Sequence, residues 1–253
     1  MLVHGTAGAT HTWRNVLPRL AEWADVIAFD LPGHGFTTGA TADQLSLRGM
    51  SNAVSALLTA LSVQPVIGVG HSAGAAVLLQ LVSAGEVVPR SIIGVNSALV
   101  SVNALGQLFL PVSRELLDID VLRRGVASLL RNGLLPDALL RTTGTPLDPP
   151  QRARYVAMLT DETRVEAVLR MMVGWDLPAL QAQFPRINVP VTLVHSSNEP
   201  WVAFDELLAA TTTLPMRTVI DVAPAGHLIP DEHPQRLADI IASTFATLAP
   251  AAG

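Results

Sequence analysis

A serine between two glycines is the strongest chemical signal in this sequence. Gly70-His71-Ser72-Ala73-Gly74 fits the pattern G-x-S-x-G, in which a sharp turn exposes a serine hydroxyl for nucleophilic attack. The apolar run 65–69 before it predicts a buried strand, and the alanine-rich run 73–82 after it predicts a helix. We expect only glycine to fit on both sides of so tight a turn. The alternative is a serine in an ordinary glycine-rich turn. The residues that a nucleophilic serine needs as partners distinguish the two interpretations.

Such a serine needs amide donors for the oxyanion that forms when it attacks a carbonyl group. The segment His4-Gly5-Thr6-Ala7-Gly8 follows a short strand at residues 1–3. From this position the backbone N–H groups of Thr6 and Ala73 are expected to form an oxyanion hole. His4 is interpreted as a structural residue that braces the loop. A plain strand-to-helix turn is the alternative for this segment.

The serine also needs a base, and His227 is the predicted one. It lies in a Gly-His loop between a strand-like run at 218–222 and a helix expected from Asp231. The other six histidines fit other roles better: bracing for His4, turn geometry for His34, packing at the elbow for His71, solvent exposure for His233, and no visible partner for His11 and His195.

A carboxylate should orient the base, and Glu199 is the predicted acid. It follows the strand 189–195, in the loop Ser196-Ser197-Asn198-Glu199-Pro200. The alternative is an uninvolved surface glutamate, while Asp205 and Asp221 are poorer candidates because they fall within a helix and a strand. The resulting chain order is nucleophile, acid, base, which differs from the orders of chymotrypsin and subtilisin.

The elements that must position these residues alternate along the chain, which predicts a parallel sheet flanked by helices in an α/β fold. Strands are expected at 1–3, 25–29, 65–69, 91–95, 189–195 and 218–222, and helices at 13–23, 46–62, 73–84, 203–211 and 231–247. The alternation breaks where helices are expected at 113–131, 136–142, 149–159 and 162–173. We therefore predict a core of residues 1–98 and 187–253 with an inserted helical cap at 99–186.

Taken together, these motifs resemble those of the α/β-hydrolase superfamily. The turn Asp30-Leu31-Pro32-Gly33-His34-Gly35 is also typical of that superfamily. The segments 144–148 and 171–177 carry a narrower similarity, to the magnesium chelatase accessory hydrolases of bacteriochlorophyll biosynthesis. That resemblance implies association with magnesium chelatase and a tetrapyrrole ligand. The chain departs from the family pattern where Glu199 replaces the usual aspartate. It also begins about a strand pair later than family members, so their N-terminal strand pair is expected to be missing.

The expected cap would supply a substrate pocket above Ser72. We expect Phe109, Met172 and Trp175 to line it together with His71, and ordinary core packing is the alternative for each of these side chains. The region 101–186 holds ten of the sixteen arginines, which could favour a substrate with carboxylates.

Composition excludes several classes of protein. There is no cysteine for disulfides or thiolate catalysis, and no lysine for a Walker-A loop or a Schiff base. The net charge of −5 argues against a general nucleic-acid-binding face. No histidine spacing suggests a metal site, no cofactor is expected, and no apolar run reads as a transmembrane segment. These features fit a cytoplasmic enzyme with a small-molecule substrate.

Two functions remain open. The first is a serine hydrolase that cleaves an acyl ester or a related substrate. The second is a non-catalytic accessory protein that binds a tetrapyrrole in the same fold. Fold alone does not separate them.

Overall fold

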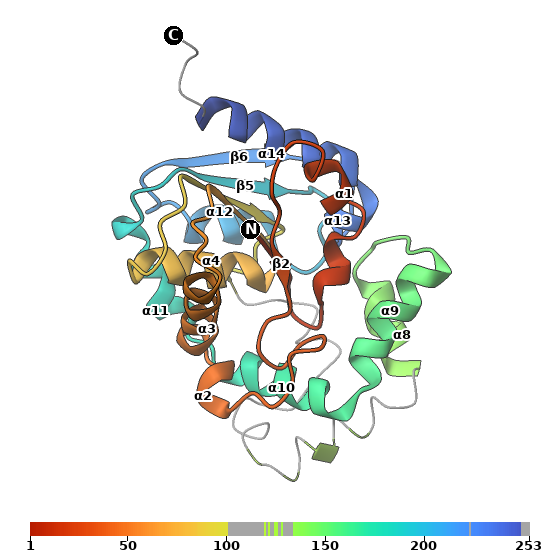
Figure 1. Ribbon diagram of the computed structural model, residues 1–253. Helices are drawn as coiled ribbons and strands as arrows, with labels where there is room; N and C mark the ends of the chain where they lie inside the picture. Colours follow the sequence, from red (N-terminus) through yellow and green to blue (C-terminus); the bar gives the residue numbers. More distant parts are fainter. Residues whose placement is uncertain are drawn as a thin grey trace.

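A parallel six-stranded sheet forms the centre of the computed structural model (Figure 1). The structure describes residues 1–100, 119, 121, 124–125, 128, 134–222 and 224–248. The spatial order of the strands is β2-β1-β3-β4-β5-β6, and every neighbouring pair is parallel. Their bounds are Leu2–Val3 (β1), Ala28–Phe29 (β2), Ile67–His71 (β3), Ser91–Val95 (β4), Val191–His195 (β5) and Arg217–Asp221 (β6).

The central strands are apolar because both faces of the sheet are covered. All five residues of β3 and of β4 are buried. Successive residues of a strand point to opposite faces, and Ile92 and Ile93 accordingly belong to two different hydrophobic clusters. One cluster contains side chains of α3 (Leu47–Ala60), α4 (Ala73–Ser83), α11 (Leu177–Gln181) and α12 (Phe204–Ala210). The other contains side chains of η1 (Thr10–Trp13), α1 (Leu17–Leu20) and α14 (Pro234–Leu248).

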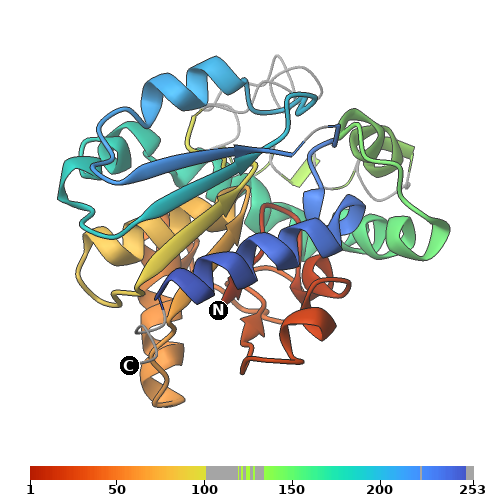
Figure 2. The ribbon, with the colours of Figure 1, turned by 90° about the horizontal axis from the view of Figure 1, so that it is seen from above.

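The described helices between β4 and β5 are α8 (Leu134–Thr142), α9 (Pro149–Thr160), α10 (Glu162–Gly174) and α11, followed by the short η2 (Phe184–Arg186). The green helices α8 and α9 lie beyond one end of the sheet in Figure 2. Leu139, Tyr155 and Leu159 of these two helices form a separate cluster with Leu228, which follows the candidate base. These helices therefore pack against the loop that carries His227.

The predicted alternation of strands and helices is confirmed, with most bounds shifted by a few residues. The predicted helix 13–23 is wrong, since the chain forms η1 and then the short α1, whose second residue, Pro18, lacks the N–H that a longer helix would need there. The predicted helix 231–247 is also wrong as one element. Pro234 restricts the residue before it, so His233 is non-helical and separates α13 (Ile229–Glu232) from α14.

The short α2 (Ala42–Leu45) was not expected, although Thr41 and Gln44 form the capping box that marks a helix start. The predicted helix 113–131 falls mostly outside the described residues.

Parallel strands bring their carboxyl ends to one edge of the sheet, where open α/β sheets place their ligands. The loop with Thr6 follows β1, Ser72 follows β3, the loop with Glu199 follows β5, and the loop with His227 follows β6. The fold therefore gathers all the residues predicted for catalysis at this edge.

Candidate active site

Ser72 forms a strained turn between β3 and α4. Its backbone angles are φ 51° and ψ −118°, outside the regions that residues with a side chain normally adopt. Conformations of this kind cost about 1–3 kcal/mol and concentrate at functional sites. The turn is the sharp strand-to-helix elbow that the G-x-S-x-G pattern predicts.

The glycines on either side of Ser72 are required by close packing. A Cβ atom on Gly70 would lie 2.5 Å from the backbone nitrogen of Ala75, and one on Gly74 would lie 2.2 Å from the carbonyl oxygen of Val3. Both contacts are far closer than a real Cβ tolerates. The expectation that only glycine fits at these two positions is confirmed, and the cause is steric contact with neighbouring backbone.

The loop after β1 lies directly on the elbow. A Cβ on Gly5 would be 2.7 Å from the Cβ of Ser72, so the two backbones pass in contact. Ala73 is the first residue of α4, where N–H groups lack a partner within the helix. Within the described part of the chain, neither the Ala73 N–H nor the Thr6 N–H donates a hydrogen bond. This arrangement leaves two amide donors beside Ser72 and supports the predicted oxyanion hole.

His4 holds this loop in place. Its Nε2 accepts a hydrogen bond from the Leu31 N–H at 3.0 Å, so the proton sits on Nδ1, which donates to the Gly5 carbonyl at 2.8 Å. Burial, with a smaller contribution from His34, lowers the pKa of His4 to about 3. His4 is therefore neutral, and its predicted bracing role is confirmed.

Glu199 and His227 form a buried pair. The distance between Nδ1 of His227 and Oε2 of Glu199 is 2.6 Å, and both side chains are almost completely shielded from solvent. The other carboxylate oxygen, Oε1, accepts a hydrogen bond from the Trp201 N–H at 2.6 Å. Burial opposes ionisation of Glu199, but His227 and these hydrogen bonds outweigh it, so the pKa of Glu199 lies below its ordinary value. The glutamate is thus an ionised partner for the imidazole.

Two aromatic side chains flank the His227 ring. The ring centroid of Trp201 lies 4.5 Å away and that of His71 lies 4.9 Å away. The indole N–H of Trp201 donates to Oγ1 of Thr142 at 3.1 Å, which fixes the tryptophan against α8. Trp201 was not predicted as a site residue, although its place two residues after the predicted acid was an available signal.

No hydrogen bond joins Ser72 to His227 within the described residues. Such contacts often tighten only when substrate binds. Ser72 and the Glu199–His227 pair are nevertheless linked through His71, whose Nε2 donates to the His227 carbonyl oxygen at 2.9 Å.

A small cavity of about 40 Å³ opens beside His71 and His227. The described residues that line it include no acidic side chain and no arginine. His71 is neutral because burial, with a further contribution from His227, lowers its pKa to about 3. The lining residues come from the loop after β1, from η1, from α8 and α9, and from the loops with Trp201 and His227: Gly5, Thr6, Ala7, Gly8, Thr12, His71, Leu139, Leu140, Thr143, Tyr155, Leu159, Trp201, His227 and Leu228. Such a site suits an uncharged group of modest size.

Of the residues predicted to bind substrate, the structure brings only His71 to this cavity. Trp175 instead donates its indole N–H to the Leu45 carbonyl at 3.0 Å, and both Trp175 and Met172 pack against the main hydrophobic cluster. Phe109 lies outside the described residues.

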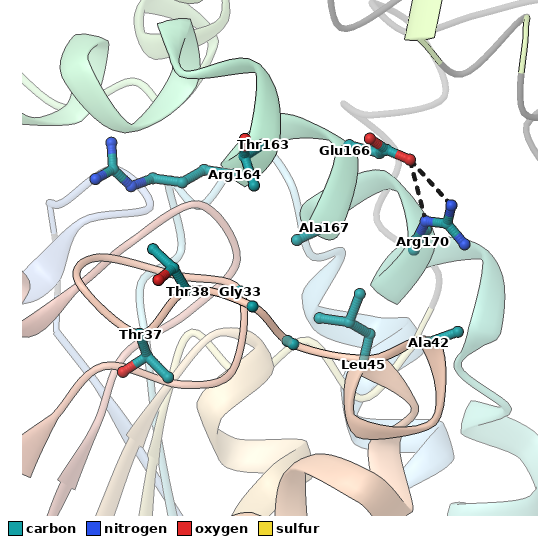
Figure 3. A pocket seen from close by; sticks show the side chains of 12 residues that line it. Gly33, Thr37, Thr38, Ala42, Leu45, Thr163, Arg164, Glu166, Ala167 and Arg170 are labelled. Atoms are coloured by element: carbon teal, nitrogen blue, oxygen red, sulfur yellow. Dashed lines mark hydrogen bonds and ion pairs between the residues drawn. The ribbon is translucent and has the colours of Figure 1, made fainter.

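A second, larger hollow of about 320 Å³ lies between α10 and the chain from Gly33 to Leu45 (Figure 3). Leu45, which accepts the bond from Trp175, forms part of its wall. Arg164 and Arg170 of α10 also line it, and Arg170 is paired with Glu166 at 3.0 Å. This hollow is thus more polar and roomier than the cavity at His227.

The described residues show neither a metal site nor a membrane-spanning helix. They contain no group of three or more histidine, aspartate or glutamate side chains placed to hold a metal ion. Nor does any helix among them combine the length and apolar character needed to cross a membrane.

Known proteins resemble this chain along most of its length. The family model described as "Alpha/beta hydrolase family" matches residues 1–240. The "Magnesium-chelatase 30 kDa subunit" of Rhodobacter capsulatus is 33% identical over 234 residues, which cover 90% of this chain and 80% of that protein.

Solved structures agree in fold. A thermophilic esterase from Thermogutta terrifontis matches with a TM-score of 0.74 at 18% identity, covering 98% of this chain and 89% of the esterase. A haloalkane dehalogenase from Bradyrhizobium elkani matches with a TM-score of 0.77 at 18% identity, covering 97% and 89%. At these identities the likeness concerns the fold, and the reactions named for the two proteins differ.

Proposed function

This chain belongs to the alpha/beta hydrolase family, and from that premise we propose that it is a serine hydrolase that cleaves acyl esters. One observation carries the proposal: the buried 2.6 Å contact of His227 with Glu199 lies at the same sheet edge as the strained turn at Ser72. A buried, ionised carboxylate that accepts a hydrogen bond from Nδ1 fixes the tautomer and orientation of the imidazole and stabilises its protonated form, which favours a role as general base.

In the proposed reaction, Nε2 of His227 removes the proton from the Ser72 hydroxyl as its oxygen attacks the ester carbonyl carbon. The carbonyl oxygen becomes an oxyanion that accepts hydrogen bonds from the Thr6 and Ala73 N–H groups. Glu199 accepts a hydrogen bond from the Nδ1–H group throughout and stabilises the imidazolium. When the tetrahedral intermediate collapses, the imidazolium protonates the leaving alkoxide, and an acyl-serine remains. Water then attacks the acyl-serine with His227 again as the base, releasing the acid.

The small neutral cavity predicts a preference for short acyl groups. We expect kcat/KM on p-nitrophenyl esters to be highest for acetate or propionate and to fall by about tenfold or more by the octanoate, since each group that does not fit loses about 1–3 kcal/mol. A series of esters from two to ten carbons, assayed under identical conditions, measures this. A steady rise in kcat/KM with chain length would contradict the assignment of this cavity as the acyl site.

A second candidate function is the binding of a tetrapyrrole, with association with magnesium chelatase as its setting. The 33% identity to the magnesium-chelatase subunit favours it. The larger hollow is lined by Arg164 and Arg170, which would exchange their present partners, Asp161 and Glu166, for the propionate groups of a porphyrin. The cavity at His227 is too small for a macrocycle.

Tryptophan quenching by protoporphyrin tests this second function, at concentrations where the porphyrin does not aggregate. We expect saturable binding that weakens about tenfold in Arg164→Gln, which removes the cation but keeps a polar side chain of similar length. The control is Arg19→Gln, because Arg19 bonds to Gln235 on the opposite side of the sheet. Non-saturable quenching, or equal affinity in all three proteins, would argue against a porphyrin in this hollow.

A further inference from the structure

The segment Thr143-Gly144-Thr145 lies against the loop that carries His227. The His227 N–H donates to the carbonyl oxygen of Thr143 at 2.7 Å. One residue later, the Leu228 N–H donates to Oγ1 of Thr145 at 3.0 Å. Gly144 and Thr145 belong to the segment 144–148 that carries the narrower family resemblance, and no role in the reaction was predicted for them.

Thr145 also links this loop to α13. Its hydroxyl donates to Oε1 of Glu232 at 2.6 Å, and the same oxygen accepts the Gly226 N–H at 2.8 Å. The Thr145 side chain thus accepts a hydrogen bond from Leu228, the residue after His227. Through Glu232 it also holds Gly226, the residue before His227. Thr145 is buried, and the bond from the Leu228 N–H to its hydroxyl is shielded from water.

The histidine loop and the segment 143–145 lie too close together for a side chain on Gly226. A Cβ on Gly226 would lie 2.5 Å from the Thr143 carbonyl oxygen and 2.7 Å from the Thr145 nitrogen. Gly144 has a positive φ of 69°, a conformation that glycine adopts without strain. Close packing of the two backbones therefore explains Gly226, and the positive φ explains Gly144.

Asn96 holds the same loop from the sheet side. Its side-chain N–H₂ donates to the backbone carbonyl oxygens of Gly226 and His227, both at 3.0 Å. Its side-chain oxygen, Oδ1, accepts a hydrogen bond from the Ser196 N–H at 3.2 Å. Asn96 has a φ of 41°, which asparagine tolerates better than most residues. With His71 donating to the same His227 carbonyl, both backbone polar groups of His227 are fixed.

We propose that Thr145 and Asn96 are positioning residues that hold the loop 226–228, so that the His227 imidazole keeps its contact with Glu199 and can reach Ser72 in the proposed reaction. This inference rests on the proposed function. Neither residue touches the reacting atoms. They act by fixing the loop, and a displacement of about 1 Å at a catalytic group can lower the rate about 100-fold.

The test compares Thr145→Val, which removes the hydroxyl at constant shape, with Thr145→Ser, which retains it. Thr160→Val is the matched control, since among the described residues the Thr160 hydroxyl bonds only to carbonyl groups of its own helix, α9. We expect kcat to fall about 10- to 100-fold in Thr145→Val with KM nearly unchanged, and both other variants to stay within about threefold of wild type.

A second readout does not depend on activity. The proton between Nδ1 of His227 and Glu199 should give a low-field proton NMR resonance, because the contact is short and buried. We expect this resonance to shift or broaden in Thr145→Val but not in Thr145→Ser. If Thr145→Val does not fold, Asn96→Asp carries the same test, since it removes both donors to the loop.

The outcomes separate the two proposals. An unchanged resonance and unchanged kcat in Thr145→Val would overturn the positioning role while the serine hydrolase stands. Absence of Ser72-dependent ester cleavage in the wild type would overturn the proposed function. A resonance that still responds to Thr145→Val would then support the positioning of His227 by itself.

Discussion

Ser72→Ala should lower the turnover of short p-nitrophenyl esters by about 10³-fold or more, because nucleophile and base act as a unit and neither replaces the other. The change removes one oxygen from a turn whose shape is set by Gly70 and Gly74, so the fold should be retained. Steady-state kinetics at pH 8, with circular dichroism to check folding, measures the effect.

Ser97→Ala is the matched control for this experiment. Ser97 is also buried at the sheet edge, after β4, and its hydroxyl has no hydrogen-bond partner among the described residues. Turnover within about twofold of wild type is expected for it, since no bond is lost. Equal activity in Ser72→Ala and wild type would remove Ser72 from the reaction.

Glu199→Gln should lower kcat by about 10³- to 10⁴-fold while leaving the fold intact. The amide has nearly the same shape, but its N–H₂ group would face Nδ1 of His227 and favour the wrong tautomer. It would also leave the imidazolium without a counter-charge. Glu199→Asp, which keeps the charge on a shorter side chain, should lose much less. Wild-type turnover in Glu199→Gln would move the acid elsewhere.

The same variant tests the pKa of Glu199. The pKa of Glu199 is lower in the folded protein than its ordinary value of 4.5. The ionised carboxylate therefore stabilises the fold at pH values above 4.5, and this stabilisation is lost as the pH falls through the lowered pKa. The difference in Tm between wild type and Glu199→Gln should therefore be largest above about pH 4.5 and should narrow in acid. A difference that grows as pH falls would contradict the assigned direction.

Much of the fold could be predicted because its signals are local. Apolar β-branched runs predicted the strands, and their alternation with helices predicted a parallel sheet of the α/β-hydrolase type, which the structure and the family match confirm. The errors have local causes too, since Pro18 and Pro234 limit helices that periodicity alone extends. The division into a core and a cap at residues 99–186 stays a prediction.

The candidate site was partly predictable because its chemistry needs few residue types. Ser72, Glu199 and His227 could be chosen by type and by their places after strands, and the contact of the last two is a finding of the structure. The contacts of Thr145 and Asn96 with the histidine loop join segments more than 80 residues apart. Nothing in their local sequence indicates that packing. Trp175 is the opposite case. Its residue type suggested contact with a ligand, but its indole N–H donates to the backbone carbonyl of Leu45.

Covalent labelling determines whether Ser72 is a nucleophile activated by His227 and Glu199. A fluorophosphonate should react with the Ser72 oxygen, releasing fluoride and leaving a phosphonyl group that mass spectrometry can locate on the peptide containing Ser72. We expect stoichiometric labelling of wild type and Ser97→Ala, much slower labelling of Glu199→Gln and none of Ser72→Ala. Ester turnover with no adduct at Ser72, or with an adduct on a different residue, would contradict the account.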